Sequence, residues 1–174
     1  DLAVPALDAA QDRVLEIPST SGFATPDIER DIIKMAVIER HMATGRVGKG
    51  FVQGLGLRRG AIASTIAHDH HNLVVIGADD RSMMTAARRV AALHGGMVVA
   101  DGERVLAEVP LPLGGLMSLE PVEVVHRQVA EAVSGARELG SPLRDPFMTM
   151  GFLALEVIPA LKLTDQGLVD VERF

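Results

Sequence analysis

Short runs of Val, Ile, Leu and Ala recur along this chain, and polar or glycine-rich segments separate them. Residues 61–67 and 72–78 are two such runs, and their length and β-branched content predict two buried strands. Residues 34–41 fit a helix only in part, because their Val and Ile cluster, so we favour a strand there. From residue 45 to residue 60, glycines interrupt the apolar positions, which predicts a strand with bulges or tight turns.

Two helices are predicted from the spacing of apolar residues and from the residues that flank them. Residues 83–94 carry apolar side chains at helical spacing, with Asp79 as a candidate cap before them and Gly95 as a stop after them. A second apolar stripe runs over residues 122–139, and Gly140 ends it.

The remaining β structure is predicted from turn residues. Residues 97–100 and 105–109 flank Asp101-Gly102, which is a strong turn dipeptide, so they predict a hairpin. Residues 152–158 and 161–171 are typical of a loop or strand pair that returns the chain to the sheet.

Several shorter segments also allow an interpretation. Residues 12–18 predict a short strand, and residues 20–26 predict a loop because they are rich in turn residues. Ser118 is more typical of a helix start than of a nucleophile, because no paired base lies near it in the sequence. Residues 165–167 predict a turn, and residues 29–31 predict a solvated face without chemistry.

These elements predict an α+β fold, with mixed β-sheets and a few packed helices in one domain. The 174 residues suffice for one hydrophobic core, which aliphatic side chains must fill because 48% of the chain is hydrophobic and only 3% is aromatic. The sequence has no alternating series of eight strands and helices, so the chain is not a TIM barrel in itself.

Charge and composition narrow the classes of partner. The formal net charge of -6 argues against a nucleic-acid partner, because phosphate binding needs clustered Lys and Arg. No apolar run approaches the roughly 20 residues that span a bilayer, so we expect no membrane association. The sequence contains no cysteine, which excludes thiolate chemistry and agrees with a reducing compartment, so we expect a cytoplasmic protein.

The segment His68-Asp69-His70-His71 concentrates the groups that carry chemistry. Its imidazoles and carboxylate are typical of metal ligands or of a general acid and base. On a strand, His68 and His70 would point to the same face and present two nitrogens to one metal ion. The alternative is a polar loop between two buried strands, with imidazoles that bond to the backbone or to solvent.

An independent metal site is a further hypothesis. It would use His68, His70 and His71 together with one of three distant histidines, His41, His94 or His126. The last two lie in predicted helices, where a lone histidine is usually a surface or packing residue.

The order of several motifs resembles the C-terminal region of the adenine deaminase family. The matching segments are GRVGKGFVQGLGLRRGAIASTIAHDHHNLVVIGADD (45–80), GGMVV (95–99), LAEVPLPLGGLMS (106–118), PFMTMGFLAL (146–155) and LKLTDQGLVDV (161–171). The resemblance covers most of residues 35–174, so we divide the chain into a connecting segment at 1–34 and a domain of this family at 35–174.

The resemblance implies a part of an enzyme rather than a whole one. The family hydrolyses adenine to hypoxanthine and ammonia, with a divalent metal ion, manganese or iron, bound in a (β/α)₈ barrel. This chain lacks that barrel, so we expect no cofactor in it and no activity from it alone. Its expected partners are the barrel of the same polypeptide, adenine in the full-length enzyme, and a second copy in a homo-oligomer.

The same resemblance changes the interpretation of the histidine segment. The family pattern reads His-Asp-Ser-His-Asn, so His70 departs from it and the metal pair loses its second member. The positions that match are His68, Asp69, His71 and Asn72, with Ser64 in the preceding strand. We predict these four polar residues as a loop that contributes to the active site, and we expect no metal ligand among them.

Two functional hypotheses therefore remain open. In the first, the domain packs against the barrel and offers residues 68–72 to the mouth of the active site. In the second, the domain is structural and provides support or an oligomer interface without contact to substrate. Met83-Met84 and residues 148–152 could form an apolar contact surface, although such a stripe is more often ordinary core.

Overall fold

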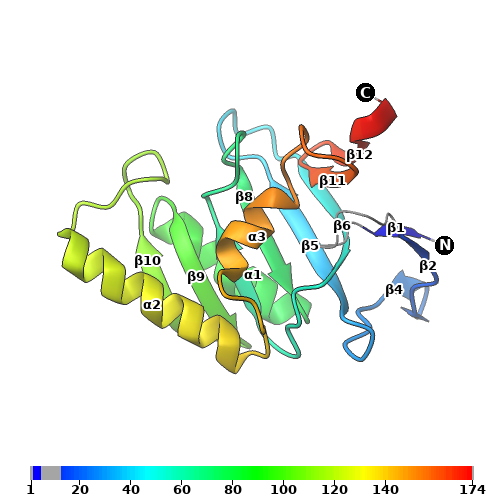
Figure 1. Ribbon diagram of the computed structural model, residues 1–174, viewed down its shortest axis with the longest axis horizontal. Helices are drawn as coiled ribbons and strands as arrows, with labels where there is room; N and C mark the ends of the chain where they lie inside the picture. The colour runs from blue at the N-terminus through cyan, green and yellow to red at the C-terminus, as the bar shows by residue number, and fades with distance from the viewer. Residues whose placement is uncertain (1, 5–12, 174) are drawn as a thin grey trace.

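The computed structural model describes residues 2–4 and 13–173, and its centre is one antiparallel sheet (Figure 1). The order of its six strands is β10-β9-β7-β8-β5-β6. The strands are β5 (Ile32–Ile38), β6 (Val47–Gln53), β7 (Ala61–Ser64), β8 (Leu73–Gly77), β9 (Gly96–Asp101) and β10 (Arg104–Pro110). The strands predicted at 34–41, 61–67 and 72–78 are confirmed, and so is the hairpin around Asp101-Gly102.

Helices and a hairpin cover the two faces of this sheet. On one face, α1 (Asp80–Ala92) packs over β7, β8 and β9. On the other face lie α2 (Val122–Glu138), α3 (Pro146–Phe152) and the hairpin of β11 (Leu161–Thr164) and β12 (Gly167–Asp170). This single domain without a barrel confirms the α+β prediction.

Alternating side chains of the central strands contribute to the hydrophobic core on each face of the sheet. Ile33, Met35 and Val37 of β5 belong to the larger cluster, which α2, α3 and β11 complete. Ala61, Ala63 and Val75 face α1 in the smaller cluster. Burial on both faces explains why these strands read as continuous apolar runs in the sequence.

The first helix begins and ends where its flanking residues predict. The Asp79 carboxylate accepts a hydrogen bond from the Ser82 backbone N–H at 2.8 Å, so Asp79 is the N-cap. After the helix, Gly95 has φ +124°, a conformation that glycine adopts without steric cost.

The second helix begins later than Ser118 predicts. Pro121 occupies the N-cap of α2 and no side chain caps it, whereas the Ser118 hydroxyl accepts from the Glu120 backbone N–H. The prediction of Ser118 as the helix start is therefore wrong.

Helix α3 is an element that the sequence patterns did not predict. Its seven residues are too few for a helical period to stand out. The usable signal was Asp145-Pro146, because the Asp145 carboxylate accepts from the Met148 backbone N–H at 2.9 Å and Pro146 opens the helix. A helix thus precedes the segment 152–158, which contains no strand.

The chain before β5 forms two small hairpins. The first pairs β1 (Leu2–Val4) with β2 (Arg13–Leu15), and the second pairs β3 (Ser19–Thr20) with β4 (Phe23–Ala24). The strand predicted at 12–18 is thus shorter in the structure, and its first residue, Asp12, lies outside the described part. The segment predicted as a loop at 20–26 contains β4. The division of the chain at residues 34 and 35 stays a prediction.

The strand pair predicted within residues 161–171 is confirmed as the β11–β12 hairpin, which returns the chain to the main sheet by packing against β5 and β6 without joining it. Glycine allows the close approach: a Cβ at Gly48 would stand 1.8 Å from the Thr164 carbonyl oxygen. No helix in the described ranges is long and apolar enough to cross a membrane.

Candidate functional site

The predicted histidine segment lies in the loop 65–72 that joins β7 to β8. The strand predicted to run to residue 67 ends at Ser64, whose hydroxyl oxygen accepts a hydrogen bond from the Ile66 backbone N–H at 2.9 Å. The loop then turns sharply, with the His71 backbone N–H donating to the Ala67 carbonyl at 2.6 Å. His71 itself has φ +48°, a conformation that few non-glycine residues adopt.

His70 anchors the loop through both of its ring nitrogens. Its Nδ1 accepts from the Asn72 backbone N–H at 3.0 Å, so Nε2 carries the proton and donates to the Ala154 carbonyl at 2.9 Å. His70, which departs from the family pattern, is thus a structural residue of this loop, because its ring ties the loop to the segment that follows α3. The strand geometry that would let His68 and His70 share a metal ion is absent, since both lie in a turn.

The other two imidazoles have unused hydrogen-bonding capacity. The rings of His68 and His71 lie with their centroids 5.8 Å apart and tilted by 56°. His68 also stacks on Phe152 at a centroid distance of 5.9 Å. The Nδ1 atoms of both histidines are buried without a hydrogen-bond partner among the described residues. Such atoms call for an explanation, and a functional role is one of those that apply.

The pKa of His71 lies below its usual value. Burial is the main cause, and the positive charges that His68, His70 and Arg40 can carry add to it. A neutral imidazole at pH 7 can accept a proton or a hydrogen bond, which an imidazolium cannot.

Arg40 and His41 hold the loop from the neighbouring connection between β5 and β6. The Arg40 guanidinium donates from Nε to the His71 carbonyl at 2.6 Å and from Nη2 to the Gly114 carbonyl at 2.7 Å. The His41 Nε2 lies 2.7 Å from the His70 carbonyl and donates to it. These backbone contacts fix the path of the chain, so the imidazoles of the loop have a rigid support.

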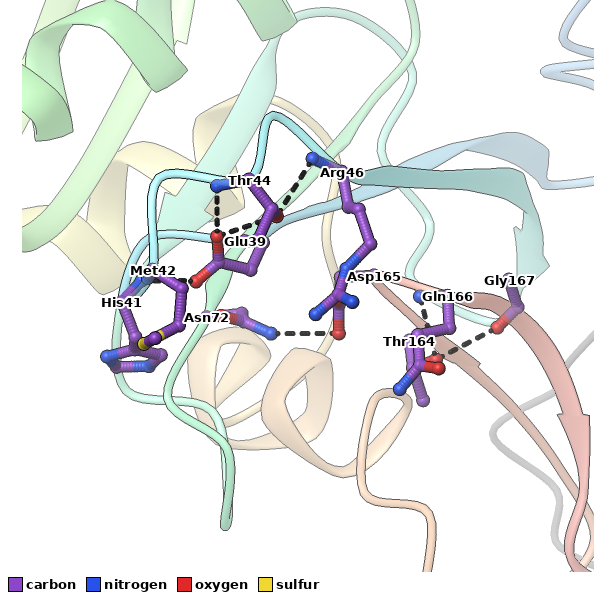
Figure 2. A network of polar contacts seen from close by, with 10 residues as sticks. All are labelled: Glu39, His41, Met42, Thr44, Arg46, Asn72, Thr164, Asp165, Gln166 and Gly167. Carbon is purple, nitrogen blue, oxygen red and sulfur yellow. Dashed lines mark hydrogen bonds and ion pairs between the residues drawn. The ribbon is translucent and has the colours of Figure 1, made fainter.

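Asn72 connects the loop to the β11–β12 hairpin (Figure 2). Its side chain is buried, and its Nδ2 donates to Asp165 Oδ1 at 3.2 Å. The other carboxylate oxygen of Asp165 accepts from Arg46 Nε at 2.9 Å. The Oδ1 atom of Asn72 is buried and has no hydrogen-bond partner among the described residues. The predicted turn at 165–167 is confirmed, but its aspartate also positions a candidate site residue.

Glu39 organises the connection beside the loop, as Figure 2 shows. Its carboxylate accepts from the backbone N–H groups of Met42 at 2.6 Å and Thr44 at 2.9 Å, and from the Thr44 hydroxyl at 2.8 Å. These bonds, with the Thr44 backbone first, lower the pKa of Glu39 to about 2. The charge therefore stays on Glu39 throughout the neutral range.

The structure brings together three of the four predicted site residues: His68, His71 and Asn72 share one loop and each has an unpartnered buried polar atom. Asp69 is exposed at the tip of the same loop. Sequence patterns missed Arg40 and Glu39, which hold the site by contacts that no spacing rule reveals. Asp31, predicted on a solvated face, is half-buried and accepts from the Gly54 and Gly56 backbone N–H groups.

The donor set does not resemble a metal centre. Among residues 2–4 and 13–173, no three His, Asp or Glu side chains gather in a way that could hold a metal ion. The arrangement can instead offer imidazoles, an exposed carboxylate and an amide to a molecule or protein surface.

Comparisons with known proteins agree with the motifs described above. A family model described as "Adenine deaminase C-terminal domain" matches residues 9–174. An adenine deaminase from Brucella melitensis is 48% identical over 171 residues, which is 98% of this chain and 29% of that protein. Adenine deaminases from Cereibacter sphaeroides and Methylobacterium nodulans are 54% and 52% identical over 91% and 98% of this chain, which corresponds to 28% and 30% of their lengths.

This chain thus spans less than a third of the length of these relatives. The match to the family model nevertheless covers nearly all of it, including the loop 65–72 and the elements that support it. The chain belongs to the adenine deaminase C-terminal domain family.

Proposed function

We propose that this chain acts as the C-terminal domain of an adenine deaminase, which converts adenine and water to hypoxanthine and ammonia, and that residues 68–72 contribute to its active site. The observation that carries the second part is the pair of buried, unpartnered Nδ1 atoms of His68 and His71. They lie on a loop that Arg40 and His70 fix in place. Catalytic and binding groups are often placed in this way, on a loop held by a rigid scaffold.

The chemistry of the loop suits a purine. Adenine presents both N–H donors and ring nitrogen acceptors, and the neutral ring of His71 can accept a hydrogen bond from such a donor. The exposed carboxylate of Asp69 is a second acceptor on the same loop. In this proposal the loop orients adenine or closes the site, and the rest of the polypeptide supplies the reaction centre.

We assign the divalent metal ion, manganese or iron, to a catalytic barrel in the rest of the polypeptide. The described side chains of this domain do not fit a metal site, because no group of three or more suitable ligands forms. His70 already uses both ring nitrogens within the fold. The metal would activate the attacking water from the barrel side.

The proposal extends to location and assembly. We place the full-length enzyme in the cytoplasm, because a sequence without cysteine needs no oxidising compartment. A homo-oligomer is also proposed, in keeping with the frequency of symmetric assemblies among enzymes.

Kinetics of the full-length enzyme test the role of the loop. His68→Ala and Asp69→Asn should each lower kcat/KM for adenine by roughly 10²-fold, the scale of a lost acid–base or orienting group. Metal content and thermal stability should stay unchanged, because Asp69 is exposed and the metal is held elsewhere. His126→Ala, an exposed histidine on α2, serves as the matched control and should leave the kinetics intact.

Unchanged kinetics in both loop variants would remove residues 68–72 from the mechanism. The domain would then be purely structural, the second hypothesis. That alternative gains support from exposed apolar side chains such as Met117 and Leu119, which follow the residues that bond Arg40 and Thr65.

A further inference from the structure

Four connections meet at the edge of the sheet that carries the histidine loop. The strands β5, β7 and β10 end at this edge and β6, β8 and β9 begin there, because all neighbours in the sheet are antiparallel. Figure 1 shows the connections before β6, before β8 and after β10 at this one end, together with the chain that follows α3.

Hydrogen bonds join these connections into one surface. Arg40 links the histidine loop to the segment after β10 through the carbonyls of His71 and Gly114. The Thr65 hydroxyl donates to the Gly115 carbonyl at 2.6 Å, and His70 donates to the Ala154 carbonyl. Side chains on the four connections therefore keep fixed positions relative to one another.

Large apolar side chains are exposed on each of the flanking connections. We call six of them the apolar collar: Met42, Leu113, Met117, Leu119, Phe152 and Val157. Met42 is 77% exposed, Leu119 72% and Met117 62%. Exposed apolar side chains on segments that share one edge of the sheet with a polar loop are a feature of protein interfaces.

We propose that the apolar collar docks against the remainder of the adenine deaminase polypeptide, so that the histidine loop enters its active site at the centre of the contact. This inference rests on the proposed function and adds the surface through which it operates. More than two thirds of the length of the relatives lies outside the part that this chain matches, so a large covalently linked partner exists in those proteins.

The polar centre of the surface favours this occupant. The Nδ1 atoms of His68 and His71 and the Oδ1 atom of Asn72 lack partners among the described residues. A partner that covers the collar must exclude water and supply hydrogen bonds to the centre, as the mouth of an active site does. Neither the exposed collar nor the unpartnered polar atoms require a second copy of the domain as the partner.

A competing surface lies on the face of the sheet that α1 covers in part. A groove of about 670 Å³ runs beside α1 over β5 and β6, lined among others by Ile38, Phe51, Met83 and Met84. Met84 is 52% exposed, comparable to the collar residues. Part of its lining, Ile38 and Val47, reaches the edge of the histidine loop, whereas Met84 lies near the start of α1, which follows the opposite end of β8, so position 84 provides the matched control.

Thiol labelling of the full-length enzyme tests the docking surface. Met117→Cys, Leu119→Cys and Met84→Cys would each place a thiol at a site that is exposed in this domain. The sequence of the domain contains no cysteine, so each label has one target within it, and peptide mapping identifies that target. Labelling at positions 117 and 119 should be at least about tenfold slower than at position 84, since the docked partner covers the collar.

Three results would overturn the proposal. The first is labelling at positions 117 and 119 as fast as at position 84. The second is protection at position 84 alone, which would assign the interface to the groove. The third is protection of the collar that disappears on dilution, which would assign it to a second copy of the chain.

A second pair of variants separates this inference from the proposed function. His68→Ala should lower turnover and leave the thiol at position 119 protected. Leu119→Asp should expose the thiol of Met117→Cys while the amides of β7 and β8 stay protected from hydrogen exchange, which shows that the fold is intact. Protection of the collar together with normal turnover of His68→Ala would support docking and reject the catalytic role of the loop.

Discussion

Three histidines of one loop have different environments, although they stand within four residues of each other. His70 has a proton on Nε2 and none on Nδ1, because an N–H donor and a carbonyl acceptor fix the two ends of its ring. His71 stays neutral because burial lowers its pKa. His68 stacks on Phe152 and keeps a free Nδ1. The roles of identical side chains are thus set by their neighbours.

Sequence patterns found the segment but not these assignments. The cluster of polar residues between two apolar runs located a loop at 68–71, and in the structure this loop begins earlier, at residue 65. The acceptor of the His70 ring, Ala154, lies 84 positions further along the chain, so no local pattern reveals it. Asp69 and Asn72, which match the family pattern, also have different environments. Asp69 is exposed, whereas Asn72 is buried and donates a hydrogen bond to Asp165. Their role in catalysis stays a prediction.

Glu39 should make the free energy of unfolding depend on pH in the acidic range. Its pKa is about 2 in the folded state against an ordinary value of 4.5, so the unfolded state binds the proton first as the pH falls. The carboxylate therefore stabilises the fold fully above pH 4.5, and this contribution is lost between pH 4.5 and about 2. Urea unfolding at a series of pH values measures the effect.

The variant Glu39→Gln should unfold at lower urea concentration at pH 7 and lose this part of the acid dependence. Its amide group would place a donor where backbone N–H groups of Met42 and Thr44 already donate. An acid dependence equal to that of the parent protein would show that other carboxylates cause it. Asp69→Asn is a suitable control, because that exposed side chain makes no such bonds.

At the scale of elements, some helices and strands follow from local sequence signals, and others depend on contacts between distant parts of the chain. Helix α1 and the β9–β10 hairpin follow from an Asp cap and an Asp-Gly turn, which act within a few residues. Helix α3 was not predicted because it is short. The strands that pair with β5 could not be predicted either, since β8 lies more than thirty residues further along the chain. Strand order is a property of packing that sequence spacing does not encode.

Two glycines of β6 provide a test of how the β11–β12 hairpin is held. A Cβ at Gly48 would meet the backbone oxygen of Thr164 at 1.8 Å, whereas one at Gly50 would meet a Leu163 methyl carbon at 3.4 Å. Backbone cannot move aside as a side chain can, so Gly48→Ala should destabilise the domain by about 1–3 kcal/mol. Gly50→Ala should cost less, because an ordinary contact needs little adjustment.

Thermal or urea unfolding of both variants measures the difference. Equal stabilities would show that the hairpin does not rest on β6 at Gly48. Because Asp165 lies in the turn of this hairpin and bonds Asn72, the Gly48 variant should also disturb the candidate site. The Gly50 variant should leave it unchanged.

At the scale of the whole molecule, the fold brings the candidate site residues to one edge of the sheet. Its described residues offer hydrogen-bonding groups on a rigid edge and no cluster of metal ligands. The resemblance to the adenine deaminase family, together with the lack of a barrel pattern, implied a part of an enzyme from the sequence. The edge that we propose as the docking surface could not be predicted, because it depends on how separate connections meet.

The chain alone should fold and show no adenine deaminase activity. In our proposal a metal ion in the barrel activates the attacking water, and no group of three or more metal ligands forms among the described residues of this chain. A spectrophotometric assay of adenine loss, with manganese or iron added, tests this expectation. Turnover above that of a His68→Ala, His71→Ala double variant would contradict it.

The histidine loop depends on residues that follow it at a great distance in the chain. It joins two neighbouring strands, yet its supports at Ala154 and Asp165 lie 84 and 93 positions beyond the residues that they hold. During synthesis, β7 and β8 can therefore pair long before these supports leave the ribosome. A shortened protein that ends before Ala154 would keep the strands of the main sheet and lose the anchors of the loop. These two anchors of the candidate site therefore become available only when nearly the whole domain has been made.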